Sequence, residues 1–189
     1  GGHIILLNPE SSPYYEATKT QAKLALRTYE GGLQIGGGIN NENAIEYLDA
    51  GATHVIVTSF VFKNGEINYD NLKKMVDKVG KQHLVLDVSC RKKGDDYYIV
   101  TDRWQKFTNV ILQEQVFEQL SDYCDEFLIH AVDVEGKASG IEEKLATMMG
   151  NANTLPMTYA GGISSMDDLG KLKTLGKEKL DFTIGSALD

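Results

Sequence analysis

The chain of 189 residues has few cysteines and no long apolar run. Its two cysteines, Cys90 and Cys124, form neither a disulfide framework nor a Cys-x-x-Cys pair, which fits a reducing compartment. No apolar run approaches 18 residues and no signal-peptide pattern is present, so we expect a cytoplasmic protein with no membrane partner. The formal net charge of -8 argues against a nucleic-acid partner.

Common cofactor motifs are also absent. The glycine-rich runs contain no Gly-x-Gly-x-x-Gly fingerprint and no lysine at the Walker position, which argues against dinucleotide and ATP binding. His, Cys, Asp and Glu do not gather at the spacings typical of metal ligands. We therefore expect neither a cofactor nor a metal.

What the sequence does contain is an alternation of short apolar runs and amphipathic segments. Seven runs have the length and β-branched composition of buried parallel strands: residues 3–7, 33–35, 54–58, 83–88, 126–131, 157–160 and 181–184. Amphipathic segments such as 43–51, 71–80 and 166–176 lie between them and end at a glycine. A chain of 20.8 kDa suits one domain over residues 1–189. This alternation predicts an α/β fold, and a doubly wound open sheet and an eight-stranded barrel both fit it.

A repeated glycine motif favours the barrel. Residues 37–39 and 161–163 both read Gly-Gly-Ile, an offset of 124 (161 minus 37), and each copy leads through a helix into a strand that ends in a small hydroxyl residue. The offset corresponds to four βα units of roughly 31 residues. We therefore predict a (β/α)8 TIM barrel with an approximate twofold internal repeat. The seven runs would be its strands two to eight, and we expect the first βα unit and the last helix to be missing from this chain.

The glycine motifs also predict two anion sites. Glycines directly after a strand let the backbone approach a ligand, and the N–H groups at the next helix start can bind an anion. The candidate phosphate-binding residues are Gly37, Gly38, Thr58 and Ser59 for the first site and Gly161, Gly162, Gly185 and Ser186 for the second. The alternative is that the glycines only make tight turns while Ser and Thr cap helices. Two such sites facing each other would bind an elongated bisphosphate.

Acid–base candidates follow two neighbouring strands. Asp87 ends the apolar strand 83–88, where an inward carboxyl group could transfer a proton. Alternatively, it turns outward to cap a helix or to pair with Arg91. His130, Asp133 and Glu135 come after the next strand, and each is either a residue of the barrel mouth or part of a solvated loop.

Two other features need an interpretation. Residues 90–110 interrupt the alternation, and a stretch of this length is usually functional or disordered. Within it, 97–100 could pair as a small strand, and Trp104 is the only tryptophan. The alternative is a loop anchored by that one aromatic residue. His54 and His83 stand at strand starts, at the opposite end of the predicted barrel, and we interpret them as structural.

Six stretches together carry a resemblance to a known family: QIGGGIN, HVIVTS, LVLDVSCR, FLIHAVDVEG, YAGGISS and FTIGSALD. They resemble the isomerases of histidine biosynthesis, in the eukaryotic, fungal-type branch, over essentially the whole chain. The resemblance implies a (β/α)8 barrel, an Amadori rearrangement without cofactor or metal, and a small-molecule substrate carrying two phosphates. We also expect a monomer.

The resemblance implies roles for single residues. Asp87 lies where the family has the catalytic aspartate of its fifth strand, the two glycine motifs match its phosphate sites, and Trp104 resembles a loop tryptophan that covers the substrate. His130 stands where many bacterial members have threonine, and we take it as a second catalytic candidate. Arg91 is a further candidate for substrate binding. The family's other catalytic aspartate belongs to the first strand, which this chain lacks.

Two alternatives stay open at this point. The first is the related barrel cyclase that takes the isomerase product onward, although VSCR and IHAVDVEG fit the isomerase better. The second is an inactive fragment that binds a bisphosphate.

Overall fold

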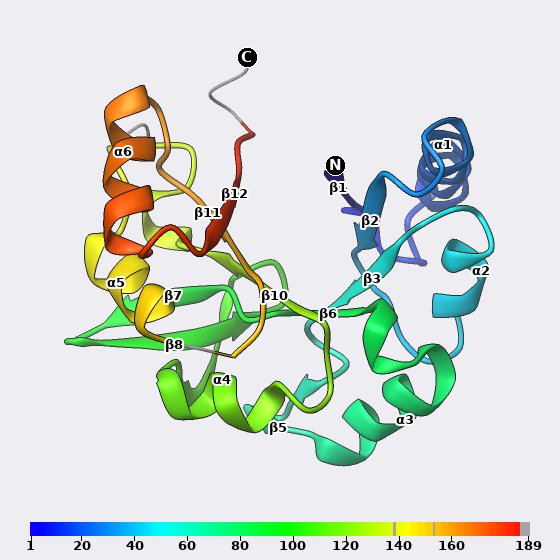
Figure 1. The fold of residues 1–189 in the computed structure, drawn as a ribbon. Helices are drawn as coiled ribbons and strands as arrows, with labels where there is room; N and C mark the ends of the chain where they lie inside the picture. The colour runs from blue at the N-terminus through cyan, green and yellow to red at the C-terminus, as the bar shows by residue number, and fades with distance from the viewer. Residues whose placement is uncertain (138, 153, 186–189) are drawn as a thin grey trace.

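We analysed a computed structural model that describes residues 1–137, 139–152 and 154–185 (Figure 1). Its main sheet has seven parallel strands in the order β1-β2-β3-β6-β10-β11-β12. Their bounds are β1 Gly2–Ile5, β2 Leu33–Gly36, β3 His54–Val57, β6 Leu84–Asp87, β10 Glu126–His130, β11 Met157–Ala160 and β12 Leu180–Thr183. All seven predicted strands are confirmed.

The strand order decides between the two predicted architectures. In the described part of the chain each strand of the main sheet pairs with the next one in sequence, so the order never reverses as it does in a doubly wound sheet. Figure 1 shows the sheet curled, with β1 and β12 at its two edges on the same side of the molecule. The doubly wound alternative is therefore wrong, and the α/β class with a curled parallel sheet is confirmed.

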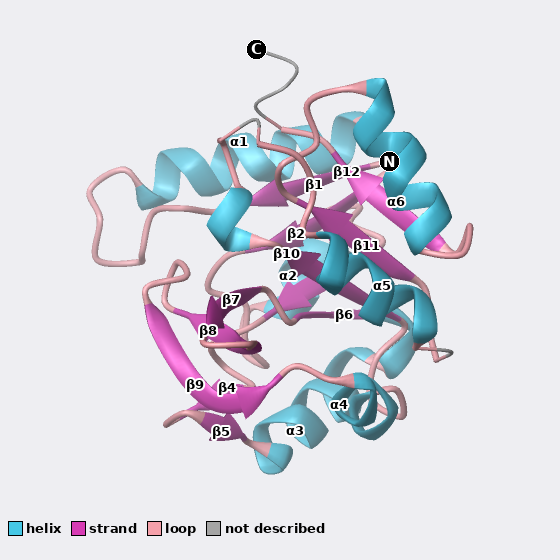
Figure 2. Cartoon of the chain, turned by 90° about the vertical axis from the view of Figure 1, so that its left-hand side faces the viewer, coloured by secondary structure: helices cyan, strands magenta, loops and turns pink. Residues whose placement is uncertain are grey.

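The helices lie outside the curl (Figures 1 and 2). They are α1 Tyr15–Thr28, α2 Ala44–Leu48, α3 Tyr69–Val79, α4 Glu114–Leu120, α5 Glu143–Asn151 and α6 Met166–Leu175, with short 3-10 turns at Lys81–His83 and Val132–Val134. Alternate strand residues pack against them. Leu84 and Leu86 belong to this outer core, whereas Val85 packs with Ile56 and Leu128 on the inner face. Burying each such aliphatic side chain contributes about 1.5–3 kcal/mol.

The same alternation sets the inner face of the curl. Because Val85 and Leu128 point inward, so do Asp87 and His130, two residues further along β6 and β10. At the other end of β10, Glu126 accepts hydrogen bonds from Gln34 Nε2 at 2.7 Å and from Thr158 Oγ1 at 2.6 Å. The carboxyl ends of β6 and β10 therefore carry the acid–base candidates on the inner face.

Residues 90–111 form a second, antiparallel sheet rather than a loop. Its strands are β7 Cys90–Lys93, β8 Asp96–Thr101 and β9 Lys106–Ile111. The strand expected at 97–100 is confirmed, but the interpretation of the rest as a loop is wrong. Tyr97 and Ile99 supply the physical reason, because they are buried in the main core and anchor β8 there. Figure 2 shows this meander with the β4–β5 hairpin, Phe62–Lys63 and Glu66–Ile67, beside β9.

The histidines at strand starts lie where we predicted them. His54 Nε2 is 3.2 Å from Asp125 Oδ2, and His83 Nδ1 is 3.0 Å from the carbonyl oxygen of Thr53. These contacts are at the amino ends of the strands, away from Asp87. Among the described helices, none has both the length and the apolar character that crossing a membrane requires.

Candidate active site

Asp87 and His130 are joined through one serine. Asp87 Oδ1 accepts hydrogen bonds from the backbone N–H of Ser89, at 2.9 Å, and from the Ser89 hydroxyl. The Ser89 oxygen also lies 3.1 Å from His130 Nδ1 and accepts from the backbone N–H of His130 at 3.0 Å. Ser89 is fully buried. Asp87 therefore faces this cluster, and the alternatives of helix capping or pairing with Arg91 are wrong.

Trp104 covers this cluster from the turn between β8 and β9. Its ring centroid is 5.1 Å from that of His130. Asp102, Arg103 and Trp104 all have positive φ, so the turn is tightly curved. Arg103 Nη2 donates to the carbonyl oxygen of Leu7 at 2.6 Å, and Ser59 Oγ is 3.5 Å from Asp102 Oδ1. The turn is thus bonded both to the segment after β1 and to the segment after β3. These contacts hold Trp104 over His130.

A cavity of about 120 Å³ lies beside His130. It brings His130 together with three predicted residues of the second phosphate site, Gly161, Gly162 and Gly185. Glu135 also lines it, as expected of a mouth residue. Ser186, the fourth residue predicted for this site, lies outside the described residues.

The two glycine pairs have the same local geometry. Gly37 and Gly38 have φ of 96° and 70°, and Gly161 and Gly162 have φ of 110° and 74°. A Cβ on Gly37 would lie 2.2 Å from the carbonyl oxygen of Leu6, and one on Gly161 would lie 2.8 Å from that of Ala131. Each first glycine thus packs against the backbone that follows the neighbouring strand. Only glycine fits this combination of dihedral angle and close approach.

The start of helix α6 is already occupied by a carboxylate of its own chain. Asp168 Oδ2 accepts from Ser164 N at 3.0 Å and from Ser165 N at 3.0 Å, and Ser165 Oγ caps the helix in return. The hydrogen bond from the Ser164 backbone, followed by that from the Ser165 hydroxyl, lowers the pKa of Asp168. The backbone N–H groups of Ser164, Ser165 and Asp168 are therefore already bonded within the chain, and phosphate binding at this helix start stays a prediction.

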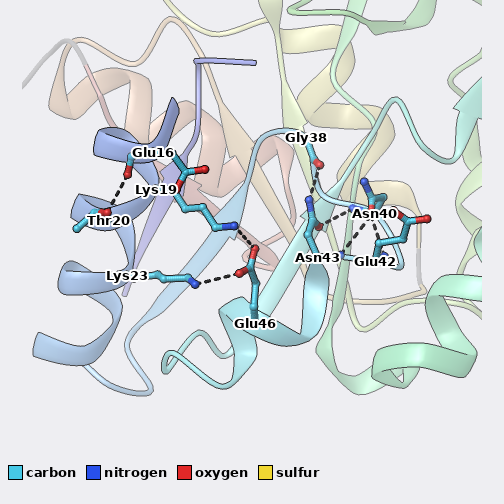
Figure 3. Close-up of polar contacts among 9 residues, drawn as sticks. All are labelled: Glu16, Lys19, Thr20, Lys23, Gly38, Asn40, Glu42, Asn43 and Glu46. Atoms are coloured by element: carbon cyan, nitrogen blue, oxygen red, sulfur yellow. Dashed lines mark hydrogen bonds and ion pairs between the residues drawn. The ribbon is translucent and has the colours of Figure 1, made fainter. Parts of the chain in front are cut away.

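Side chains also cap the segment after the first glycine pair (Figure 3). Asn40 Oδ1 accepts from the backbone N–H groups of Glu42, at 2.8 Å, and Asn43, at 3.3 Å. Asn43 Nδ2 in turn donates to the carbonyl oxygen of Gly38 at 3.0 Å. Figure 3 also shows Lys19 and Lys23 on α1, whose charges are taken up by Glu46 at 2.6 and 2.9 Å. These contacts fix the turn but provide no free cation for a phosphate.

Four other predicted residues lie apart from the cavity. Arg91 Nε is 3.2 Å from Asp133 Oδ1, and its guanidinium stacks over Phe107 with 5.4 Å to the ring centroid. Asp133 is engaged by that contact and by the backbone N–H of Lys92 at 2.7 Å. Thr58 and Ser59 directly follow β3, and Ser59 is exposed and contacts the turn that carries Trp104. The structure therefore does not bring Arg91 together with His130.

Two site residues escaped the sequence reasoning, His3 and Ser89. His3 lines the cavity from β1, and burial, partly offset by the charge of Glu126, lowers its pKa. Its inward direction follows from strand alternation, because β1 pairs His3 with Gln34 on the inner face. In the sequence, Ser89 is marked only by its position two residues after Asp87. The turn into β7 brings its hydroxyl group into contact with both Asp87 and His130.

Comparison with known proteins identifies relatives over the whole chain. A family model described as histidine biosynthesis protein matches residues 15–188. All of this chain aligns, at 52% identity, with 59% of a chloroplastic protein of Medicago truncatula named 1-(5-phosphoribosyl)-5-((5-phosphoribosylamino)methylideneamino) imidazole-4-carboxamide isomerase. Proteins of the same name from Neurospora crassa, at 42% identity, and Saccharomyces cerevisiae, at 40%, each align over 72% of their length. The chain therefore belongs to the histidine biosynthesis protein family.

Proposed function

We propose that this protein is the aldose–ketose isomerase of histidine biosynthesis, which rearranges an N-formimino aminoimidazole carboxamide ribonucleotide to its ribulosyl isomer. The observation that carries the proposal is the inward-facing cluster of Asp87, Ser89 and His130 beside a glycine-lined cavity. The names of the plant and fungal relatives support it. The plant relative is named chloroplastic, so a cytoplasmic location stays a prediction.

We further propose that the seven strands are strands two to eight of a (β/α)8 barrel with a twofold repeat. The matched dihedral angles of the two glycine pairs support this arrangement. Gly37 and Gly38, with Thr58 and Ser59, would hold one phosphate of the substrate. Gly161, Gly162 and Gly185 would hold the other, with the reacting sugar carbons between the two sites.

The chemistry needs two proton transfers. Opening the ribose ring requires a proton on the ring oxygen, and forming the enolamine requires removal of a proton from C2. Asp87 is our candidate for the acid that protonates the ring oxygen. His130 lines the cavity and is the candidate partner for proton transfer at carbon. Trp104 covers His130, and a covered site excludes water from the enolamine.

Replacing Asp87 tests the proposal directly. Asp87→Asn in the full-length protein should lower turnover about 100- to 10,000-fold, the range over which a positioned acid or base acts. The matched control is Asp133→Asn, which removes a carboxylate that binds Arg91 outside the cavity. Chromatography of the ribulosyl product measures both. If Asp87→Asn stays within tenfold of normal turnover while the control behaves normally, Asp87 is not the acid.

The two alternative functions can be distinguished from the isomerase by testing which substrate the protein converts. The cyclase would consume the ribulosyl isomer instead of forming it, and a bisphosphate-binding protein would bind without forming product. The relatives' names favour neither. Incubating the full-length protein with each isomer in turn, and analysing the products, distinguishes all three.

A further inference from the structure

We infer that Ser89 is a positioning residue, which holds His130 in the tautomer whose proton is on Nδ1 and so leaves Nε2 as the acceptor. Nothing in the resemblance or the comparisons assigns a role to Ser89. The inference deepens the proposed function, because it defines what His130 can do there, but it is carried by hydrogen-bond geometry alone.

The Ser89 oxygen has three hydrogen-bond partners, Asp87 Oδ1, the backbone N–H of His130 and His130 Nδ1. A serine hydroxyl has one proton to donate and two lone pairs that accept. Asp87 Oδ1 already accepts from the backbone N–H of Ser89 at 2.9 Å, so it is an acceptor, and the Ser89 proton points to it. One lone pair of the Ser89 oxygen then accepts from the backbone N–H of His130 at 3.0 Å.

The remaining contact fixes the histidine. His130 Nδ1 lies 3.1 Å from the Ser89 oxygen, whose single proton is already used. A hydrogen bond there therefore requires that Nδ1 carries the proton and donates it. The assignment is unchanged if the other carboxyl oxygen of Asp87, Oδ2, holds a proton, because Oδ1 remains the acceptor.

A fixed tautomer has a chemical consequence. In neutral imidazole one nitrogen donates and the other accepts. With the proton on Nδ1, the lone pair of Nε2 lies on the side of the ring away from Ser89, and His130 lines the cavity. Trp104 covers the ring, which limits its reorientation. Ser89 thus orients His130, the candidate base, and is itself held by Asp87. It does this without touching the substrate.

Nitrogen NMR tests the tautomer without any turnover. In the full-length protein labelled with ¹⁵N-histidine, at a pH where the rings are neutral, the His130 signals should show a protonated Nδ1 and a bare Nε2. The signals of His130 are identified as those that disappear from the spectrum of the His130→Gln variant. In Ser89→Ala the Nδ1 preference should be lost, and Ser89→Thr, which keeps the hydroxyl, should restore it. A wild-type His130 with its proton on Nε2 would overturn the inference, even if Ser89→Ala did not fold.

Kinetics supply a second readout. Ser89→Ala should lower kcat about 10- to 100-fold, as loss of an orienting partner does, and leave KM within about twofold. Thr53→Val is the control, because it removes a hydroxyl that bonds to the Leu33 carbonyl at the other end of the strands. An unchanged kcat in Ser89→Ala would contradict the inference. If no variant or wild-type protein turned over the substrate, the proposed function would fail, while the NMR result would still decide the role of Ser89.

Discussion

Gly38 and Gly162 share a backbone conformation but lie in different surroundings. Their φ angles are 70° and 74°. A Cβ on Gly38 would meet no heavy atom of the described residues within 4 Å, its chain neighbours aside. A Cβ on Gly162 would lie 2.0 Å from the carbonyl oxygen of Gly140 and 3.0 Å from Val134 Cγ2. Alanine should therefore cost a similar conformational energy at both positions, but only at Gly162 should it also push the neighbouring segment away.

The magnitudes follow from these two contributions. Placing an L residue in the left-handed region costs about 1–2 kcal/mol. Forcing extra atoms into a packed site costs a further 1–3 kcal/mol, roughly. Gly38→Ala should therefore lower the free energy of unfolding by about 1–2 kcal/mol, and Gly162→Ala by about 2–5 kcal/mol. At this chain length each kcal/mol shifts Tm by about 2–4 °C.

Urea unfolding of both variants in the full-length protein, followed by circular dichroism, measures the difference. The open space above Gly38 is where we propose that a phosphate lies, so Gly38→Ala should raise KM about tenfold, the equivalent of 1.4 kcal/mol. Equal losses of stability would refute the packing argument. An unchanged KM in Gly38→Ala would refute the phosphate site.

Three further predictions concern charge, fluorescence and thiol chemistry. The pKa of Asp168 is lowered in the folded state, so its contribution to stability is present above the unfolded pKa of about 3.9 and is lost as pH falls through the folded value. Asp168→Asn should cost about 1–2 kcal/mol at pH 7 by urea unfolding, and progressively less as the pH falls below the unfolded value. Trp104 is the only tryptophan, so His130→Gln and substrate binding should each change the fluorescence spectrum, and an unaltered spectrum would contradict the stacking. Burial raises the pKa of Cys124 to about 12, so Ellman's reagent should modify neither Cys124 nor the buried Cys90 before unfolding.

The central strands of the main sheet were predictable because they are largely buried on both faces. Runs such as residues 83–88 read as continuous apolar segments, and their regular spacing with helices leaves few other pairings. The inward direction of Asp87 also follows from strand alternation once β6 is placed. What single-strand reasoning could not supply was the neighbour of Asp87, because the contact from Ser89 to His130 joins the segment after β6 to the neighbouring strand β10.

The meander was missed for a different physical reason. Its strands carry exposed lysines, Lys92, Lys93 and Lys106, so their pattern resembles a polar loop. Tyr97 and Ile99 are the residues that anchor β8, and their burial depends on contact with the main core. The capping box of α6 was also missed, although Ser165 and Asp168 have the Ser-x-x-Asp spacing that predicts one.

The strand order described above also sets how the sheet can assemble. Every parallel pairing joins neighbours in sequence, but the spans differ: Gln34 pairs with His54 only 20 residues on, whereas Val85 pairs with Glu126, 41 residues on. Closing the longer loop costs about 0.6 kcal/mol more as an unstructured chain. The meander β7 to β9 lies inside that longest span, and its antiparallel contacts are local. If the meander forms first, it shortens the effective loop, and we expect the segment that carries Trp104 over the site to speed the joining of β6 to β10 as well.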